Sequence, residues 1–141
     1  ACGEAEPEHM TVRAALVDAP PTLDPALAYV AQHYQQEIRM TDLARACAMS
    51  ESHFRRLFYQ TTGMNPSDYV NRYRIHRALN LLRMTNDSIL AVAMRAGFPS
   101  IATFNRNFLH YMGQSPKQWR NSQKPYRKDA LLWQKSFSDS E

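Results

Sequence analysis

The chain has 141 residues and a formal net charge of +4, and 44% of its residues are hydrophobic. This length suits one compact domain, or two small ones that share an element, with a core that needs no metal or disulfide bonds. No apolar run approaches the ~20 residues of a membrane span, and the N-terminus lacks a signal-peptide core. Two cysteines, one terminal and one inside an apolar helical pattern, argue against a disulfide framework, so we expect a reducing, cytoplasmic location.

Charge is distributed unevenly along the chain. Residues 1–24 contain five acidic residues, one arginine and three prolines, which predicts a disordered leader or interdomain linker. The chain does not begin with methionine, so we expect a C-terminal piece of a longer protein, a processed terminus or an engineered one. Residues 40–121 contain ten arginines and one lysine against four acidic residues, a net charge of +7. That balance fits a surface that meets phosphates or base edges, and a solvated basic face is the alternative.

The first predicted subdomain is helical. Asp24-Pro25 is typical of a helix start, and apolar residues follow at one-sided helical spacing. Thr41 is expected to cap a short helix, residues 48–50 to form a tight turn, and a second helix to run from about 51 to 61. Gly63 ends that helix because glycine adopts the left-handed conformation without strain. Two short helices around a tight turn describe a helix-turn-helix.

A long helix is predicted next, with Asn65 as its cap and Pro66 in its first turn. At 100° per residue its apolar side chains fall on two faces. The first face holds Tyr69, Val70, Tyr73 and Leu81, and the second holds Ile75, Ala78 and Leu82. A helix that is apolar on two faces needs two bodies to pack against.

The helix-turn-helix pattern occurs twice. Six positions recur at a shift of 50: Phe54, Arg56, Phe58, Gly63, Pro66 and Tyr69 return as Phe104, Arg106, Phe108, Gly113, Pro116 and Trp119. In the second copy Asp87 or Ser88 is expected to cap a helix, Gly97 to form the turn and Ser100 to open the next helix. The predicted organisation is a leader at 1–24, a first subdomain at 25–64, a connecting helix at 65–83, a second subdomain at 84–121 and a tail at 122–141.

The candidate binding residues lie on the second helix of each copy. With the phenylalanines facing inward, arginines occupy the outward faces, and an arginine can bond guanine at O6 and N7 in the major groove. The candidates from this pattern are Arg55, Arg56 and Arg106. For Arg55 and Arg56 the alternatives are solubility or a phosphate contact, and for Arg106 an intramolecular salt bridge. Ile101 and Ala102 either meet thymine methyl groups or pack on the turn.

Further candidates concern phosphates and catalysis. Thr41, Ser88, Ser100 and Asn105 are candidate phosphate contacts, with helix capping as the usual role of the first two. The five histidines and two cysteines show no metal-ligand spacing, and the four glycines form no phosphate loop. We therefore expect no metal, no cofactor and no enzymatic activity.

These motifs resemble the DNA-binding domain of AraC/XylS-type bacterial transcription regulators. The resemblance runs from about 26 to 120 and is most specific in the second copy, where Ile89-x-x-Val92-Ala93-x-x-x-Gly97-Phe98 precedes Phe104-x-Arg106-x-Phe108 and Gly113-x-x-Pro116. It implies an all-α fold of about seven helices, with two helix-turn-helix subdomains joined by a long central helix. It also implies double-stranded DNA binding, in which two recognition helices enter successive major grooves.

Carried over position by position, the family's base contacts fall on Ser52, Arg55, Arg56, Ile101, Ala102, Thr103 and Arg106. Ser52 is smaller than the residues often found there, and Ile101 and Ala102 lack polar groups. The resemblance also implies a transcription regulator, an activator by expectation, that contacts RNA polymerase. The leader resembles a linker to an N-terminal effector-binding or dimerisation domain. The alternative function is a helical protein-interaction module that has lost DNA binding.

Overall fold

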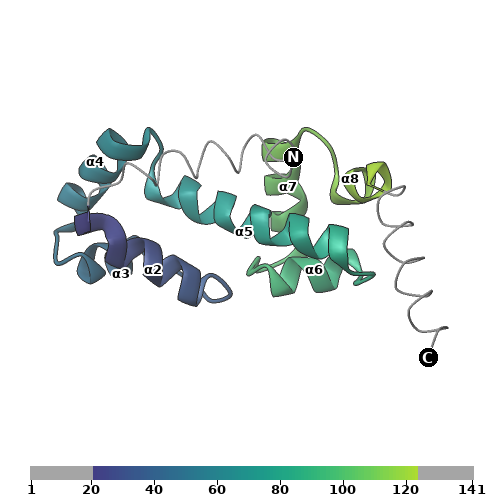
Figure 1. Ribbon diagram of the computed structural model, residues 1–141, viewed down its shortest axis with the longest axis horizontal. Coiled ribbons are helices and arrows are strands. Elements are labelled where there is room, and N and C mark those ends of the chain that lie inside the picture. Colours follow the sequence, from purple (N-terminus) through teal and green to yellow (C-terminus); the bar gives the residue numbers. More distant parts are fainter. Residues whose placement is uncertain (1–20, 124–141) are drawn as a thin grey trace, which may run out of the picture. The chain divides into compact units, whose positions relative to one another are not determined.

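The computed structural model describes residues 21–123, which contain seven α-helices, one short 3-10 helix and no strand (Figure 1). The predicted all-α fold with about seven helices is therefore confirmed. In chain order the elements are η2 (Pro21–Leu23), α2 (Asp24–His33), α3 (Met40–Ala46), α4 (Glu51–Thr62), α5 (Pro66–Met84), α6 (Ile89–Arg95), α7 (Ile101–Met112) and α8 (Pro116–Ser122). Most of the predicted leader and tail, at 1–20 and 124–141, lies outside the described residues.

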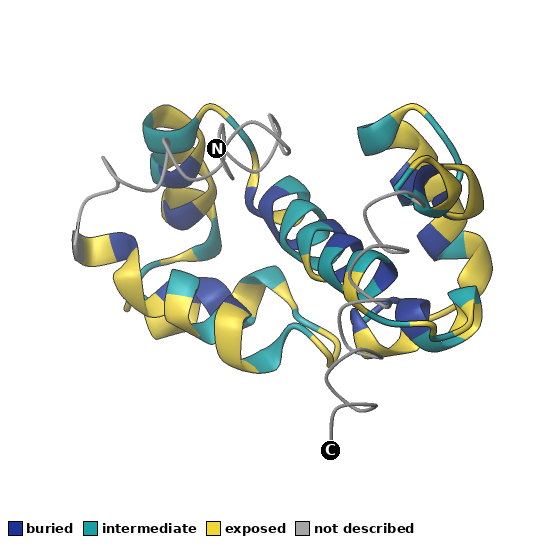
Figure 2. Ribbon diagram, turned by 45° about the vertical axis from the view of Figure 1, so that its right-hand side comes forward, coloured by how far each residue is buried: buried dark blue, intermediate teal, exposed yellow. Residues whose placement is uncertain are grey.

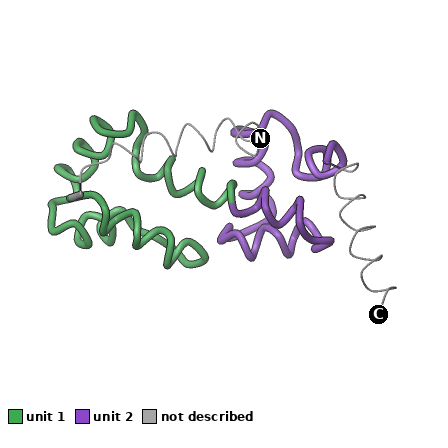
Figure 3. The backbone as a smooth tube through the Cα atoms, in the orientation of Figure 1, with its two compact units in different colours: residues 1–76 green, residues 77–141 purple. Residues whose placement is uncertain are grey.

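The chain divides into two compact units, which we call unit 1 (residues 1–76) and unit 2 (residues 77–141) (Figure 3). The boundary falls inside α5. Helix α5 is the predicted long helix that joins the two subdomains, and its first part belongs to unit 1 and its last part to unit 2. Each unit thus holds one helix-turn-helix, formed by α3 and α4 in unit 1 and by α6 and α7 in unit 2.

The core of unit 1 is built around the aromatic residues of α4. Phe54 and Phe58 are fully buried, and the ring of Phe58 lies 5.7 Å from that of Tyr69 on α5. Leu23 is also fully buried, within the 3-10 helix that precedes α2. The core of unit 1 therefore includes a residue that precedes the predicted first subdomain at 25–64, because burial of the Leu23 side chain fixes the segment that carries it.

Unit 2 repeats this aromatic arrangement. Phe104 and Phe108 are fully buried with ring centroids 5.6 Å apart, and Phe108 lies 6.3 Å from Trp119 on α8. These residues are the copies, 50 positions later, of Phe54, Phe58 and Tyr69. The repeat in the sequence is therefore a repeat of two core aromatics on one helix and a third on the next.

The two apolar sets of α5 are separated along the helix. Tyr69 and Val70 are buried in the core cluster of unit 1, and in unit 2 the buried α5 residues are Ala78, Leu79 and Leu82. The two-face pattern predicts most of these positions, but it omits Leu79 and includes Tyr73 and Leu81, which are only half-buried. The reason is that each unit packs against one end of α5. Burial therefore depends both on the direction of a side chain around the helix axis and on its position along the helix. Figure 2 shows buried positions recurring between exposed ones along the helices.

Most of the predicted helix starts are confirmed. Asn65 accepts a hydrogen bond from the Asp68 amide at 2.8 Å, and the hydroxyls of Ser50, Ser88 and Ser100 each cap the helix that follows. Thr41 is wrongly predicted as a cap, because α3 begins at Met40 and its N-cap is Arg39, two residues before Thr41. The carboxylate of Asp42 instead accepts a hydrogen bond from the Arg39 amide at 3.2 Å. Helix α2 starts at the predicted Asp24-Pro25, with Asp24 as its first residue and Leu23 at its N-cap position.

The helix ends and turns use left-handed backbone. Gly63 and Gly113 end α4 and α7 at φ 77° and 73°, as the repeat predicts. The turn of the second helix-turn-helix holds Gly97 at φ 96°, whereas the first holds Ala48 at φ 55°. A non-glycine residue in this region costs roughly 1–2 kcal/mol, so the first copy accommodates strain that the second avoids.

Two arginines bind backbone carbonyls at helix ends, Arg74 just after α2 and Arg120 at and just after the end of α5. Arg74 donates to the carbonyls of Tyr34 and Gln36 at 2.8 and 2.7 Å. Arg120 donates to three carbonyl oxygens, those of Leu82, Thr85 and Asp87, at 3.1, 3.3 and 2.6 Å. Carbonyls in the last turn of a helix and just after its end lack intrahelical partners, and a forked guanidinium can satisfy several of them at once. Burial lowers the pKa of Arg74, because a half-buried position disfavours the charged form.

Replacing Arg120 by lysine should destabilise unit 2 by about 2 kcal/mol, because one ammonium group cannot reach three separated carbonyls. Urea unfolding followed by circular dichroism measures this difference. Arg95→Lys is the control, since Arg95 pairs with Asp87 at the surface and lysine can keep that pair. Equal losses in the two variants would contradict the role given to the Arg120 fork.

Tyr69 makes stability depend on alkaline pH. Burial, with a smaller effect from the neighbouring Tyr73, raises the pKa of Tyr69 to about 12. The folded state then keeps a proton that the unfolded chain loses above about pH 10, so stability falls by up to about 1.4 kcal/mol per pH unit between pH 10 and 12. Tyr69→Phe should flatten this decline in unfolding measured at several pH values. Tyr59→Phe, which alters an exposed phenol, is the control.

Candidate nucleic-acid interface

Helix α4 presents the candidate residues of unit 1 on its exposed side. The burial of Phe54 and Phe58 sets the inward face, and Ser52, Arg55 and Arg56 are all exposed. The Ser50 hydroxyl accepts a hydrogen bond from the His53 amide at 3.2 Å, which places Ser52 in the first turn and the two arginines directly after it. The start of α4 thus carries three of the predicted base-contact residues on the outside of the unit.

Arg55 and Arg56 differ in their surroundings. Arg55 donates from Nε and Nη2 to one carboxylate oxygen of Glu51, at 3.1 and 2.9 Å. The pair is partly exposed, with 46% of the Arg55 side chain and 42% of the Glu51 side chain accessible. Arg56 makes no ion pair within residues 21–123. On α4 the predicted set therefore contains Arg55, which is paired with Glu51, and Arg56, which has no ion-pair partner in the described part of the chain.

Helix α7 carries the candidates of unit 2. Ala102, Asn105 and Arg106 are exposed, and Ile101 is 39% exposed. Among the described residues Arg106 forms no ion pair, so the salt bridge weighed as its alternative role is not found there. Thr103 is half-buried, and its hydroxyl accepts a hydrogen bond from Ser100 at 3.1 Å. Thr103 is thus held against the cap of its own helix.

The candidate phosphate contacts have local roles of different kinds. Ser88 and Ser100 cap α6 and α7, accepting from the amides of Ala91 and Thr103, both at 3.1 Å. Thr41 lies exposed in the first turn of α3, and its predicted capping role is the one corrected above. The structure therefore confirms capping for Ser88 and leaves the Thr41 side chain exposed to solvent.

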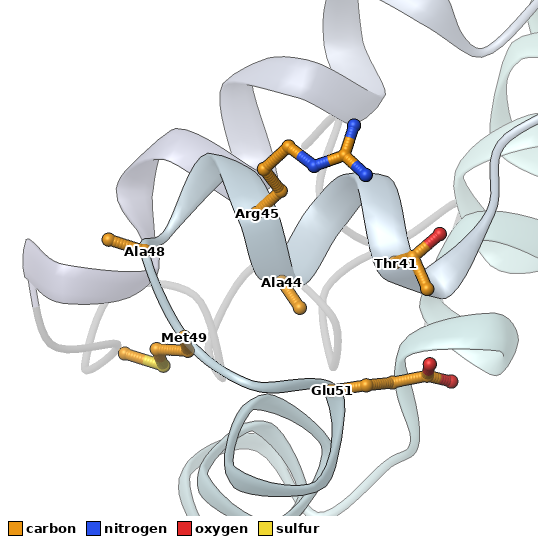
Figure 4. Close-up of a pocket in the computed structure, with 6 residues that line it drawn as sticks. All are labelled: Thr41, Ala44, Arg45, Ala48, Met49 and Glu51. Atoms are coloured by element: carbon orange, nitrogen blue, oxygen red, sulfur yellow. The ribbon is translucent and has the colours of Figure 1, made fainter.

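A shallow pocket of about 380 Å³ lies between α3 and the start of α4 (Figure 4). Its lining residues are Thr41, Ala44, Arg45, Ala48, Met49 and Glu51. Arg45 is exposed, and it is not among the candidate binding residues predicted from the sequence. Arg45 follows Thr41 by one helical turn, which puts both side chains on the same side of α3, and this spacing could have indicated Arg45 as a candidate. Glu51 was missed too, although its spacing of four residues from Arg55 is typical of a helical ion pair.

The candidates form two separate groups, one in each unit. Unit 1 brings together Thr41, Ser52, Arg55 and Arg56 on α3 and α4, and unit 2 brings together the candidates of α6 and α7. Within residues 21–123, no group of histidine, cysteine or acidic side chains could hold a metal ion. No helix in that part of the chain is long and apolar enough to cross a membrane.

A duplicated helix-turn-helix, with exposed arginines on the second helix of each copy, defines the class of this protein as a double helix-turn-helix domain. Comparison with protein families agrees, because the profile described as "Helix-turn-helix domain" matches residues 43–122. The chain belongs to the AraC-type helix-turn-helix family, whose members are DNA-binding domains of transcription regulators.

Curated relatives are named as transcription regulators. An HTH-type transcriptional regulator of Mycobacterium tuberculosis is 39% identical over 84 residues, which cover 60% of this chain and 32% of that protein. Uncharacterised HTH-type regulators of Staphylococcus aureus are 29% identical over 113 residues, which cover 80% of this chain. The chain spans only 15% of the length of those staphylococcal proteins.

Solved structures share the fold. The DNA-binding domain of the transcription factor AdpA, determined in complex with a target DNA, has a TM-score of 0.72 at 28% identity, covering 77% of this chain and 98% of that one. An AraC-type regulator of Chromobacterium violaceum has a TM-score of 0.68 at 27% identity, covering 73% and 92%. The likeness extends over most of the part of the chain that the structure describes.

Proposed function

We propose that this chain binds specific sequences of double-stranded DNA and regulates transcription, with α4 and α7 as its two recognition helices. The observation that carries the proposal is the repeated unit itself. In each copy two phenylalanines bury one face of the second helix and leave an arginine-bearing face exposed near its start. A helix of this kind reads base edges in the major groove with its first turns. The AdpA domain, which resembles this chain, is a DNA complex.

The proposed base contacts are divided between the two helices. On α4 they are Ser52, Arg55 and Arg56, and on α7 they are Ile101, Ala102, Thr103 and Arg106. The arginines would bond guanine, while Ile101 and Ala102 would meet thymine methyl groups. The two helices would enter successive major grooves, ~34 Å apart along the DNA.

Contacts with backbone phosphates would fix the position and orientation of the protein along the DNA duplex. Thr41, Ser88, Ser100 and Asn105 are the proposed contacts, and we add Arg45 because its exposed guanidinium lies on the same side of α3 as Thr41. Such contacts fix orientation but carry no sequence information. Activation through RNA polymerase, and control by an N-terminal effector-binding domain, belong to the same proposal by family resemblance.

One observation favours the competing function, a protein-interaction module. Ile101 is 39% exposed beside the exposed Ala102, so the start of α7 has an apolar surface that a protein partner could cover. The two functions differ in their dependence on salt. DNA binding releases condensed counterions from the phosphates, whereas an apolar protein contact does not.

Selection from a pool of random duplexes at two salt concentrations separates the two functions. We expect enrichment of a site that spans two major-groove segments, and a loss of affinity of about 100-fold between 50 and 200 mM salt if about four phosphates are neutralised. Absence of any salt-sensitive binding would contradict the proposal and support the interaction module.

Arg106→Ala should weaken binding to the enriched site by about 1–3 kcal/mol and flatten the preference at one base pair. Titration of the enriched duplex and of its single-base variants measures both effects. Lys117→Ala is the matched control, because it removes one exposed positive charge from α8 in the same unit. If Arg106→Ala bound every duplex as the wild type does, α7 would not be a recognition helix.

A further inference from the structure

The ion pair on α4 uses one particular edge of the Arg55 guanidinium. Both hydrogen bonds, from Nε at 3.1 Å and from Nη2 at 2.9 Å, end on the same oxygen, Oε1 of Glu51. Glu51 is the first residue of α4, and Arg55 follows one turn later on the same face. The side edge of the guanidinium, formed by Nε and Nη2, is therefore occupied by the protein itself.

The other edge of this guanidinium stays available. An arginine has five N–H donors, and the pair with Glu51 takes one on Nε and one on Nη2. The remaining donors are two on Nη1 and one on Nη2, and one N–H from each of these nitrogens forms the end edge. Two parallel donors of this kind match the O6 and N7 acceptors of guanine in the major groove. Arg55 can thus keep its partner while it bonds a base.

The charge of the pair distinguishes a base contact from a phosphate contact. Glu51 and Arg55 together carry no net charge, so the pair gains little from the phosphate backbone, whereas Arg56 has no such partner within the described residues. The second copy has no equivalent ion pair, because the positions 50 residues after Glu51 and Arg55 are Ile101 and Asn105. The pair is therefore a property of the first helix-turn-helix alone.

We infer that Glu51 is a positioning residue that sets base specificity in unit 1. It holds the Arg55 fork with its end edge free for guanine and cancels the charge that would draw Arg55 to phosphate. This inference rests on the proposed function, since it concerns how α4 discriminates between sequences. Its consequence is that an acidic residue at a DNA-binding surface raises selectivity while it lowers general affinity.

A simpler role for Glu51 makes different predictions. A carboxylate in the first turn of a helix is stabilised by the helix dipole, and its loss would lower thermal stability without changing sequence preference. In our proposal Glu51→Gln frees Arg55 to reach a phosphate. Affinity for random duplex should then rise, and the slope of log K against log salt should steepen by about 0.9.

The decisive experiment compares variants of the full chain on the enriched duplex and its single-base variants. Arg55→Ala first identifies the base pair that depends on Arg55. At that pair we expect the wild type to prefer guanine by about 10-fold or more, and Glu51→Gln to reduce the preference by about 3- to 10-fold. Asp68→Asn is the control, because Asp68 makes a similar pair with Arg72, four residues apart on α5.

The double variant Glu51→Gln with Arg55→Ala completes a double-mutant cycle, which tests whether Glu51 acts through Arg55. If Glu51 acts through Arg55, removing Glu51 in the Arg55→Ala background changes no base preference, and this result supports the inference. An unchanged preference in Glu51→Gln, or a loss in Arg55→Ala that is equal for all duplexes, would overturn it while the proposed function stands. Failure of the wild type to bind any duplex would instead overturn the proposed function. Thermal unfolding of each variant confirms that it is folded.

Discussion

Helix α5 is the element on which both cores depend. Tyr69 and Val70 near its start are buried in unit 1, and Ala78, Leu79 and Leu82 near its end are buried in unit 2. Each unit is small, and a small unit buries a low fraction of its surface, so neither can easily lose the apolar side chains that α5 supplies. The same helix closes the first helix-turn-helix and opens the second. A change that unwinds α5 would therefore weaken both units at once.

The aromatic residues connect the fold to the surface that we propose binds DNA. In both copies two phenylalanines one turn apart fix which side of the second helix faces the core. The exposed side is then determined by helical geometry, and it carries Arg56 in the first copy and Arg106 in the second. Specificity can therefore change through the exposed residues while the core stays constant. Glu51 and Ile101, at equivalent positions, show how far the two copies already differ.

Much of the fold could be predicted from the sequence because its signals are local. The repeat located the core phenylalanines and the terminal glycines, and Asn65 before Pro66 located the start of α5. Features that depend on distant contacts were missed. The burial of Leu23 is decided by residues elsewhere in unit 1, and the carbonyls bound by Arg120 lie more than 30 residues away in the sequence. The start of α3 was misplaced because a side chain inside the helix, that of Asp42, caps it in place of the preceding hydroxyl that the pattern suggested.

The arginines that bind backbone carbonyls affect how the net charge of residues 40–121 should be interpreted. The excess of +7 over residues 40–121 includes Arg74 and Arg120, which are half-buried and bonded to carbonyl oxygens of their own units. Their positive charges stabilise the architecture, and their donors are already directed at the protein. A count of arginines over residues 40–121 therefore overstates the number of guanidinium donors that can bond a polyanion. Charge and hydrogen-bonding capacity are different quantities in this domain, and Arg74 and Arg120 keep the first while using much of the second within their own units.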